Sequence, residues 1–464
     1  MMNWDFKELE DFSRNVNLVL ILDHGGRAGS NFFQCIFDKK ADFVVSPLIH
    51  YVYSYWHRVF GGRNCVSAKE GHAFVSEISY SRLLYQDPVA DIGRLIYKIG
   101  GDVSAPFDRV SFRKLIDSIF EGRESVTRKQ VILWTYAAYA MVRGYRLSGV
   151  KLIGINDAVS LSSENMLIGF SGVVIDNAAE DFPQLINLAL VRDPRAQYAS
   201  TRHQMLNEFG NNYAIKPGNW LASLVKLYSE KFSLEHGPAH FCSFYQYATF
   251  KALMKKCKSS KGRWYFIKNE DINCSFLPTM TALCNVLGIS VHPEWIEQGD
   301  NYRVTMLGRP WAGTGAYNSR YQQVVDGPIA NDSDEMSAKA TGPNRYVTER
   351  WRKRIPSSEI SILNCLFFEE ISKFGYGEGG EPKFQPKGLP ILSLWSFCAG
   401  EFPGRDWLFT KGKIVARLYY LMAFWPFYFL SRIKLNKFYK QERFFSGLGS
   451  DSFDLIFISD KWNN

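Results

Sequence analysis

The sequence predicts an α/β protein in which a mostly parallel central sheet is flanked by helices. Short apolar segments that are typical of buried strands occur at 18–22, 41–46, 151–155, 186–191 and 264–268. Helical patterns separate most of these segments, and such alternation favours parallel strands joined by helical crossovers. In addition, polar residues follow the strands directly. Ligands bind in sheets of this kind at the carboxyl ends of the strands.

The first strand leads into a glycine-rich turn at 25–30, and helical spacing of Phe32, Phe33, Ile36 and Phe37 follows. Such a turn can direct several backbone N–H groups, and the N-terminus of the following helix, at one anion. It is not a Walker A motif, because that motif ends in Gly-Lys-Ser/Thr and this turn ends in Gly29-Ser30. Taken alone, the turn is either an anion site or an ordinary strand-to-helix connection.

A second strand, at 186–191, also enters a turn and then a helix. The turn reads Arg192-Asp-Pro-Arg195, with Pro194 where the first turn of a helix accepts proline. Together, the turn Gly26-Arg27-Ala28-Gly29-Ser30 and the segment Arg192–Arg195 with Ser200 resemble the two nucleotide signatures of the sulfotransferase superfamily. The sulfuryl donor of that family is 3′-phosphoadenosine 5′-phosphosulfate (PAPS).

Two later segments extend the resemblance. Residues 264–272 are similar to the family's strand that ends in a Glu-Asp-Leu turn, and 345–376 resembles its closing segment, with Trp351-Arg352 and a terminal Gly375-Tyr376. The match covers roughly 17–376. We therefore expect a sulfotransferase domain at 1–385 with a P-loop-like fold, a helical insertion at about 60–148, and a helical C-terminal extension at 386–464.

The resemblance implies which residues hold the donor, and it implies no metal. The 5′-phosphosulfate is expected at the first turn, and the 3′-phosphate at the second turn and, by a looser match, in the closing segment. The donor-binding residues are therefore Gly26, Arg27, Ala28, Gly29, Ser30, Asn31, Arg192, Ser200 and Arg345. Arg27 is also expected to act in catalysis by electrostatic stabilisation only, since arginine does not donate its proton.

The general base that accepts the proton of the acceptor hydroxyl is left open by the sequence. Family members carry either a Glu after the second strand or a His after the third. Here the Glu is missing, and the nearest titratable group is His50; the third strand ends in Asn156-Asp157. His50 and Asp157 are equal candidates, with loop packing or a helix cap as their structural alternatives, and His57 comes next.

Composition limits the remaining classes of function. The net charge of +9 suits an anionic donor, but no recognition helix or dense basic run indicates nucleic acid. The eight cysteines lack metal-ligand spacing and lie mostly in apolar stretches, which is typical of reduced core thiols. The N-terminal residues lack the pattern of a signal peptide or anchor, which favours a cytoplasmic, bacterial enzyme. The oligomeric state is not predicted.

An apolar run at 414–430 is flanked by lysines and arginines, so the segment 411–434 suits peripheral contact with a membrane surface. The acceptor is expected to be a hydroxyl of a carbohydrate or glycolipid. Two alternatives to a sulfotransferase stay open: a P-loop nucleotide kinase-like phosphotransferase, and a non-catalytic, membrane-associated protein that binds a nucleotide.

Overall fold

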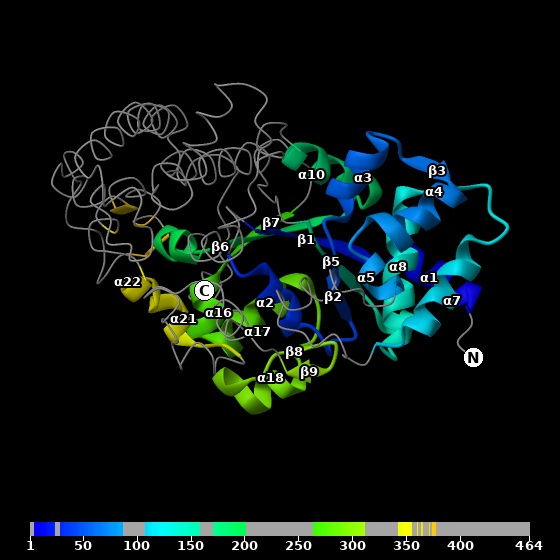
Figure 1. Ribbon diagram of the computed structural model, residues 1–464. Coiled ribbons are helices and arrows are strands. Elements are labelled where there is room, and N and C mark those ends of the chain that lie inside the picture. The colour runs from blue at the N-terminus through cyan, green and yellow to red at the C-terminus, as the bar shows by residue number, and fades with distance from the viewer. Residues whose placement is uncertain are drawn as a thin grey trace, which may run out of the picture.

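The computed structural model describes residues 4–23, 28–86, 107–157, 170–200, 263–310 and 342–354, with 360, 363, 364, 371 and 374–376. Its main sheet has the strand order β2-β5-β1-β6-β7, and every pairing in it is parallel (Figure 1). The strands are β1 (Asn17–Asp23), β2 (Phe43–His50), β5 (Leu152–Asn156), β6 (Ile186–Val191) and β7 (Arg263–Lys268). The predicted α/β class with a parallel sheet is confirmed.

Helices cover both faces of this sheet, which explains why β2, β5 and β6 are buried along their whole length instead of alternating. Figure 1 shows α3 and α10 on one face and α2, α16 and α17 on the other. These helices are α2 (Ser30–Ile36), α3 (Val52–Phe60), α10 (Phe170–Asp181), α16 (Asn269–Cys274) and α17 (Phe276–Leu287).

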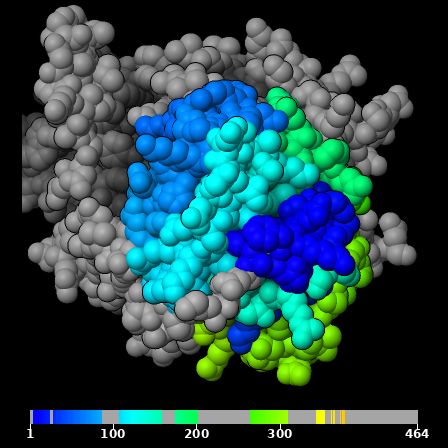
Figure 2. All heavy atoms as spheres, turned by 90° about the vertical axis from the view of Figure 1, so that its right-hand side faces the viewer, coloured from blue at the N-terminus to red at the C-terminus, as the bar shows by residue number. Residues whose placement is uncertain are grey.

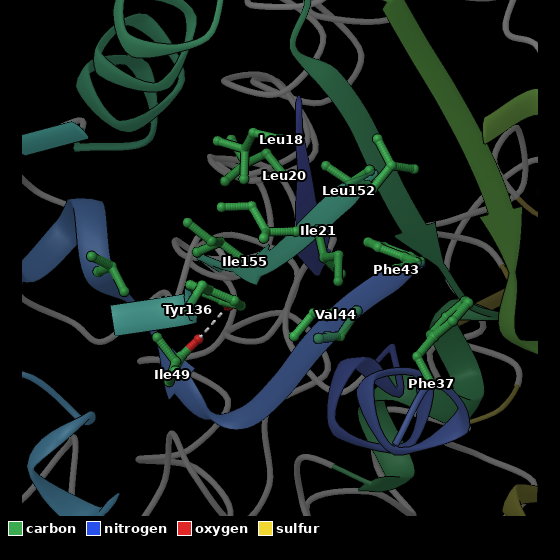
Figure 3. Close-up of a cluster of buried hydrophobic side chains, with 14 of the residues drawn as sticks. Leu18, Leu20, Ile21, Phe37, Phe43, Val44, Ile49, Tyr136, Leu152 and Ile155 are labelled. Carbon is green, nitrogen blue, oxygen red and sulfur yellow. Dashed lines mark hydrogen bonds between the residues drawn. The ribbon is translucent and has the colours of Figure 1, made fainter. Parts of the chain in front are cut away.

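Side chains of β1, β2 and β5 form the centre of the hydrophobic core (Figure 3). The hydroxyl group of the buried Tyr136 donates hydrogen bonds to the carbonyl groups of Ile49 at 3.2 Å and Gly154 at 2.6 Å. Gly154 is required by packing, because a Cβ atom there would lie 2.7 Å from Cγ2 of Val45. This contact holds β2 close to β5.

The described part of the insertion is mainly helical, as predicted. It contains α4 (Ala68–Ala73), a π-helix η1 (Phe74–Ile78), α5 (Arg82–Tyr85), α7 (Arg109–Phe120) and α8 (Arg128–Val142). Figure 2 shows the N-terminal helix α1 (Phe6–Asn15) packed on the surface of this region. The insertion packs beyond β2, at one edge of the sheet (Figure 1).

A small antiparallel sheet inside the insertion was not predicted, because each of its strands has only three residues. Strands β3 (Cys65–Ser67) and β4 (Ser125–Thr127) pair with Val66 opposite Val126. Each strand lies inside one copy of an eleven-residue sequence pattern, Phe-x-Gly-Arg-x-x-Val-Ser/Thr-x-Lys-Glu/Gln. The first copy is Phe60–Glu70 and the second is Phe120–Gln130.

The two copies of this pattern form equivalent bonds. The amide of Ala68 donates to the carbonyl group of Glu124 at 3.0 Å, and the amide of Arg128 donates to that of Asn64 at 2.8 Å. Each strand then starts a helix through a capping box, Ser67 with Glu70 in one and Thr127 with Gln130 in the other. An approximate two-fold axis therefore passes between the two valines.

A short hairpin follows α18 (Pro293–Gln298) and a 3₁₀ turn η5 (Gly299–Asn301). Its strands are β8 (Thr305–Met306) and β9 (Arg309–Pro310), and the turn residues Leu307 and Gly308 have φ of 52° and 83°. The buried carboxylate of Asp38 fixes the hairpin, because it accepts hydrogen bonds from Thr305 Oγ1 and from the amides of Leu307 and Gly308 at 2.7–3.0 Å. Residues 311–341 lie outside the described residues.

The closing segment begins with α21 (Arg345–Glu349) and α22 (Trp351–Arg354). The predicted extension at 386–464, with the basic and apolar segment 411–434, lies outside the described residues. Within the described ranges, no helix is both long and apolar enough to cross a membrane.

Candidate functional site

Polar residues end four of the five parallel strands and directly follow the fifth, β6, and the strand register brings them to one edge of the sheet. Asp23 of β1 is opposite Leu190 of β6, and Val191 is opposite Lys268 of β7. The end of β1, where the first turn begins, is therefore next to the end of β6, where the second turn begins at Arg192. On the other side of β1, the ends of β5 and β2 carry the base candidates.

The first turn is attached to the end of β1 by Asp23, a residue that the sequence analysis did not single out. The Oδ1 atom of Asp23 accepts from the amide of Ala28 at 2.8 Å, and its Oδ2 atom accepts from the hydroxyl group of Ser30 at 2.7 Å. All three residues are buried. Gly26 and Arg27 lie outside the described residues. A carboxylate at the end of a buried strand, before a glycine-rich turn, was the available signal.

Gly29 and Ser30 begin helix α2, with Asn31 in its first turn. Gly29 has φ of 99°, which favours glycine, and a Cβ atom there would lie 2.3 Å from Nδ2 of Asn269. Both constraints explain glycine at this position. Ser30 does not cap the helix, because the N-cap position is Gly29 and no side chain caps α2. The hydroxyl group of Ser30 donates to Asp23 instead. In this arrangement it can only accept a further hydrogen bond.

Hydrogen bonds between buried amide side chains connect the same helix to the strands β5 and β2. Asn156, at the end of β5, donates from Nδ2 to Oε1 of Gln34 at 3.0 Å, and Gln34 donates from Nε2 to the carbonyl group of Ser46 in β2 at 3.1 Å. Gln34 is fully buried. These bonds fix α2 relative to β2 and β5, and hence the first turn relative to the base candidates.

Arg192 and Ser200 belong to the second turn and the helical stretch 194–200, and both are buried. Arg192 donates from Nη2 to the carbonyl group of Val347 in α21 at 3.2 Å. The following amide, of Asp193, donates to Oε1 of Glu270 at 3.0 Å. The turn is thus held between α16 and the closing segment.

Arg195, although part of the recognised motif, has a structural role here. Its guanidinium group forms several hydrogen bonds with the carboxylate of Asp193 at 2.7–3.2 Å and donates to the carbonyl group of Tyr376 at 2.6 Å. It also donates to Oδ1 of Asn364 at 3.1 Å and stacks 4.4 Å from the ring centre of Trp351. Arg195 therefore joins the second turn to the closing segment.

Glu270, at the start of α16, carries an unusual carboxyl group. Burial and, next, the charge of Asp193 raise its pKa to about 7, while the charge of Arg192 opposes this shift. Its Oε1 atom accepts from Asp193, but its Oε2 atom is buried and has no hydrogen-bond partner in the described structure. The sequence analysis noted the Glu-Asp turn only as a family feature.

Arg345, which the resemblance places at the 3′-phosphate, lies at the surface in this structure. Its side chain is 79% exposed and forms an ion pair with Glu349 one helical turn later, at 3.3 Å. Arg350, five residues further on, is buried. The segment still reaches the second turn, through the carbonyl group of Val347.

His50, the last residue of β2, is buried and neutral. Its Nδ1 atom lies 2.9 Å from the carbonyl group of Pro47, which favours the tautomer with hydrogen on Nδ1. Burial lowers its pKa to about 4. The Nε2 atom is then an acceptor, and among the described residues it has no hydrogen-bond partner.

Three half-buried tyrosines surround His50. The ring centre of Tyr80 is 4.2 Å from that of the imidazole, Tyr51 is at 4.7 Å, and Tyr55 is 5.4 Å from Tyr80. Tyr51 has φ of 55°, a strained value for a tyrosine. The amide of Tyr51 donates to the carbonyl group of Asn156 at 2.8 Å, which holds this conformation in place.

Asp157 caps a helix. Its fully buried carboxylate accepts hydrogen bonds from the amides of Tyr53 and Ser54, at 2.5 and 3.1 Å, and from the hydroxyl group of Ser54 at 2.5 Å. Burial raises its pKa to about 6, against these hydrogen bonds. All three donors belong to the first turn of α3, so Asp157 has the role of a helix cap, which was the structural alternative to a general base. His57 lies in the last turn of the same helix.

The remaining titratable groups do not assemble a metal centre in the part of the chain that the structure describes, where no group of three or more His, Cys, Asp and Glu side chains could hold an ion. The four described cysteines are free. Cys35 and Cys284 are buried as expected, whereas Cys65 and Cys274 are exposed and are not core thiols.

Comparison with known proteins gave no match to a family model and none to a curated protein. Among solved structures, the chain is similar to the sulfotransferase domain of the Synechococcus PCC 7002 olefin synthase, with 12% identity, a TM-score of 0.39, and coverage of 78% of this chain and 96% of that one. It is also similar to a sulfotransferase domain from the curacin biosynthetic pathway, with 13% identity, a TM-score of 0.35, and coverage of 75% and 96%. Likenesses this distant assign neither family nor activity, so the function has to be argued from the residues of the site.

Proposed function

We propose that this protein is a sulfotransferase that transfers a sulfuryl group from PAPS to an acceptor hydroxyl. One observation supports this most strongly: β1 and β6 pair in parallel, so their carboxyl ends lie side by side, and each strand is followed in sequence by a segment that resembles one of the superfamily's two phosphate-binding signatures. PAPS carries its 5′-phosphosulfate and its 3′-phosphate at opposite ends of one ribose. Two neighbouring anion sites suit that arrangement.

On the donor side, Arg27 and the backbone amides from Gly26 to Asn31 would bind the 5′-phosphosulfate, and Arg192 with Ser200 would bind the 3′-phosphate. The acceptor oxygen attacks sulfur, the bond from sulfur to the bridging phosphate oxygen breaks, and adenosine 3′,5′-bisphosphate leaves. Such a transfer needs positioning and charge stabilisation more than covalent help. Asp23 contributes by holding the turn in shape through Ala28 and Ser30.

His50 is the better of the two base candidates. Its Nδ1 atom is engaged with Pro47, so its Nε2 atom can take the proton from the acceptor hydroxyl. The lowered pKa keeps the imidazole neutral at pH 7. Asp157, by contrast, uses both carboxylate oxygens to cap α3.

The tyrosines around His50 support an acceptor with a carbohydrate portion. Half-buried tyrosine rings combine an apolar face with a polar hydroxyl group, which matches the C–H faces and hydroxyl groups of a sugar. A glycolipid would present the same chemistry. A cytoplasmic location with peripheral membrane contact through 411–434 belongs to this proposal, and co-sedimentation with anionic vesicles at low and high salt tests the membrane contact.

Equilibrium binding tests the donor assignment. We expect adenosine 3′,5′-bisphosphate to bind without metal and more tightly than ATP with magnesium. Arg192→Ala should weaken this binding by the ~1.5–3 kcal/mol of a charge-assisted contact, with the exposed Arg345→Ala as a control that changes little. Stronger binding of ATP would favour the kinase-like alternative. Turnover of labelled PAPS over a panel of sugars and glycolipids then separates an enzyme from a protein that only binds nucleotide.

A further inference from the structure

The carboxyl group of Glu270 lies beside the proposed 3′-phosphate site. One of its oxygens, Oε1, is engaged by the amide of Asp193, the residue after Arg192. The other, Oε2, is buried with no hydrogen-bond partner in the described structure. A buried carboxylate oxygen without a donor is costly, and the cost disappears if the group is protonated or receives a hydrogen bond.

The charges around this carboxyl group come from three elements. The turn after β6 presents Arg192, which favours the charged form, and Asp193, which disfavours it. Asp193 is itself paired with Arg195. On α16, the same helix, Asp271 and Cys274 are the other titratable groups. From the closing segment, α21 supplies the exposed pair Arg345–Glu349, followed by the buried Arg350.

An anion bound at Arg192 changes this balance. It competes with Glu270 for the positive charge of the guanidinium group and adds negative charge next to a buried carboxylate. Protonation removes that repulsion. It also turns Oε2 into a donor that can bond to a phosphate oxygen.

We propose that Glu270 couples binding of a 3′-phosphorylated nucleotide to the uptake of a proton, so that the nucleotide binds more tightly when this carboxyl group is neutral. The inference rests on the proposed function, because it needs the 3′-phosphate at Arg192. Glu270 is then a positioning residue, which holds the second turn through Asp193 and sets the charge that the phosphate meets.

The direction in which affinity changes with pH distinguishes proton uptake by Glu270 from the titration of the ligand's own phosphate groups. Phosphate groups lose their second proton near pH 6, which favours binding at higher pH. Burial raises the pKa of Glu270 to about 7 without ligand, and an adjacent phosphate raises it further. Proton uptake by Glu270 therefore makes the affinity fall as the pH rises above 7.

The test is calorimetric titration of the full-length protein with adenosine 3′,5′-bisphosphate from pH 6 to 8.5. For the wild type we expect the dissociation constant to rise roughly threefold to tenfold between pH 7 and 8.5, within the limit of tenfold per pH unit for one proton. Titrations at pH 7.5 in two buffers of different ionisation heat should show net proton uptake. Glu270→Gln should abolish both effects, and Glu294→Gln, at a surface ion pair with Lys39, should preserve them.

The outcomes separate the two proposals. Binding that is constant or stronger above pH 7 in the wild type, or a parallel profile in Glu270→Gln, would overturn the coupling alone. If Glu270→Gln does not fold, the wild-type profile and the measured proton uptake decide. Absence of bisphosphate binding at every pH would overturn the proposed function and the coupling with it.

Discussion

His50 and Asp157 show how similar positions at the ends of neighbouring strands acquire different roles. Both are buried, and each can accept a proton. The difference lies in their partners, since α3 supplies three donors to Asp157 and only the carbonyl group of Pro47 engages His50. A carboxylate that is consumed in capping a helix is poorly placed for proton transfer.

If His50 is the base, His50→Ala should lower turnover by ~10²–10⁴-fold and leave the affinity for the bisphosphate nearly unchanged. Turnover of the wild type should not fall until the pH approaches the imidazole pKa of about 4, because the base must be neutral. Steady-state kinetics with PAPS and calorimetry measure the two effects, and His72→Ala, at a partly exposed pair with Asp117, is the control. Near-normal turnover of His50→Ala would exclude it as the base.

Asp157→Asn should instead lower stability, by about 1–3 kcal/mol at pH 7, because both carboxylate oxygens accept hydrogen bonds and one of them becomes an NH₂ group that cannot accept. The folded carboxyl group has a raised pKa of about 6, so its contribution to stability is largest below its unfolded pKa and falls as the pH rises through 6. Denaturant unfolding of both proteins from pH 4 to 7 should show the difference shrinking with pH. Equal stability of the two proteins would remove the capping role.

At the scale of the elements, the first turn depends on contacts from two strands. Asp23 at the end of β1 fixes Ala28 and Ser30, and Asn269 after β7 lies directly against Gly29. Residues 28–30, the described part of the turn, are therefore attached to this edge of the sheet.

Gly29→Ala should reduce both stability and bisphosphate affinity, since the new methyl group meets Asn269 and the φ of 99° costs ~1–3 kcal/mol for alanine. Adding Asn269→Ala should relieve the steric part only. Thermal melts and calorimetry of the two single variants and the double variant separate the parts. Full recovery in the double variant would show that backbone strain contributes nothing.

How far the sequence predicts such a site depends on the range of the interaction. The strands, the two turns and the start of α2 follow from apolar runs and glycine or proline positions, so they were predictable. The bonds of Asp23 to its own turn were missed, though the signal is local. The pairing of Glu270 with Asp193, the exposure of Arg345 and the capping by Asp157 depend on tertiary neighbours far away in sequence, and no local pattern encodes them.

At the scale of the whole molecule, Arg195 links the sheet to the closing segment. It bonds to Asp193, Asn364 and Tyr376 and stacks on Trp351, and so connects residues far apart in the chain. The segment that supplies Val347 to the second turn is held by this side chain together with the hydrogen bonds from Arg192 to Val347 and from the amide of Asn344 to Asn273.

Arg195→Ala should destabilise the protein by about 3 kcal/mol, because it leaves the carboxylate of Asp193 buried without its partner. Limited proteolysis should then cut first in 342–376, and the bisphosphate should bind more weakly. Arg352→Ala, which removes the other cation stacked on Trp351, is the matched control. An unchanged cleavage pattern would mean that Arg195 does not hold this segment.

Removal of the C-terminal extension tests the domain boundary. We expect a chain that ends at residue 385 to bind the bisphosphate as the full chain does, since every described residue of the proposed donor site precedes that point. Calorimetry on both chains measures this. A truncated chain that is insoluble or does not bind would show that the extension belongs to the fold.

The paired strands β3 and β4 have a consequence for assembly. The two copies of the sequence pattern within one chain meet across an approximate two-fold axis at Val66 and Val126. Strand β3 of one molecule therefore presents the same pairing edge to β4 of a second molecule as to its own β4. Two chains that exchanged these strands reciprocally would keep all the bonds of the pair. Refolding at high concentration is therefore expected to yield a strand-exchanged dimer. After dilution this dimer should dissociate slowly, because the paired strands must separate first.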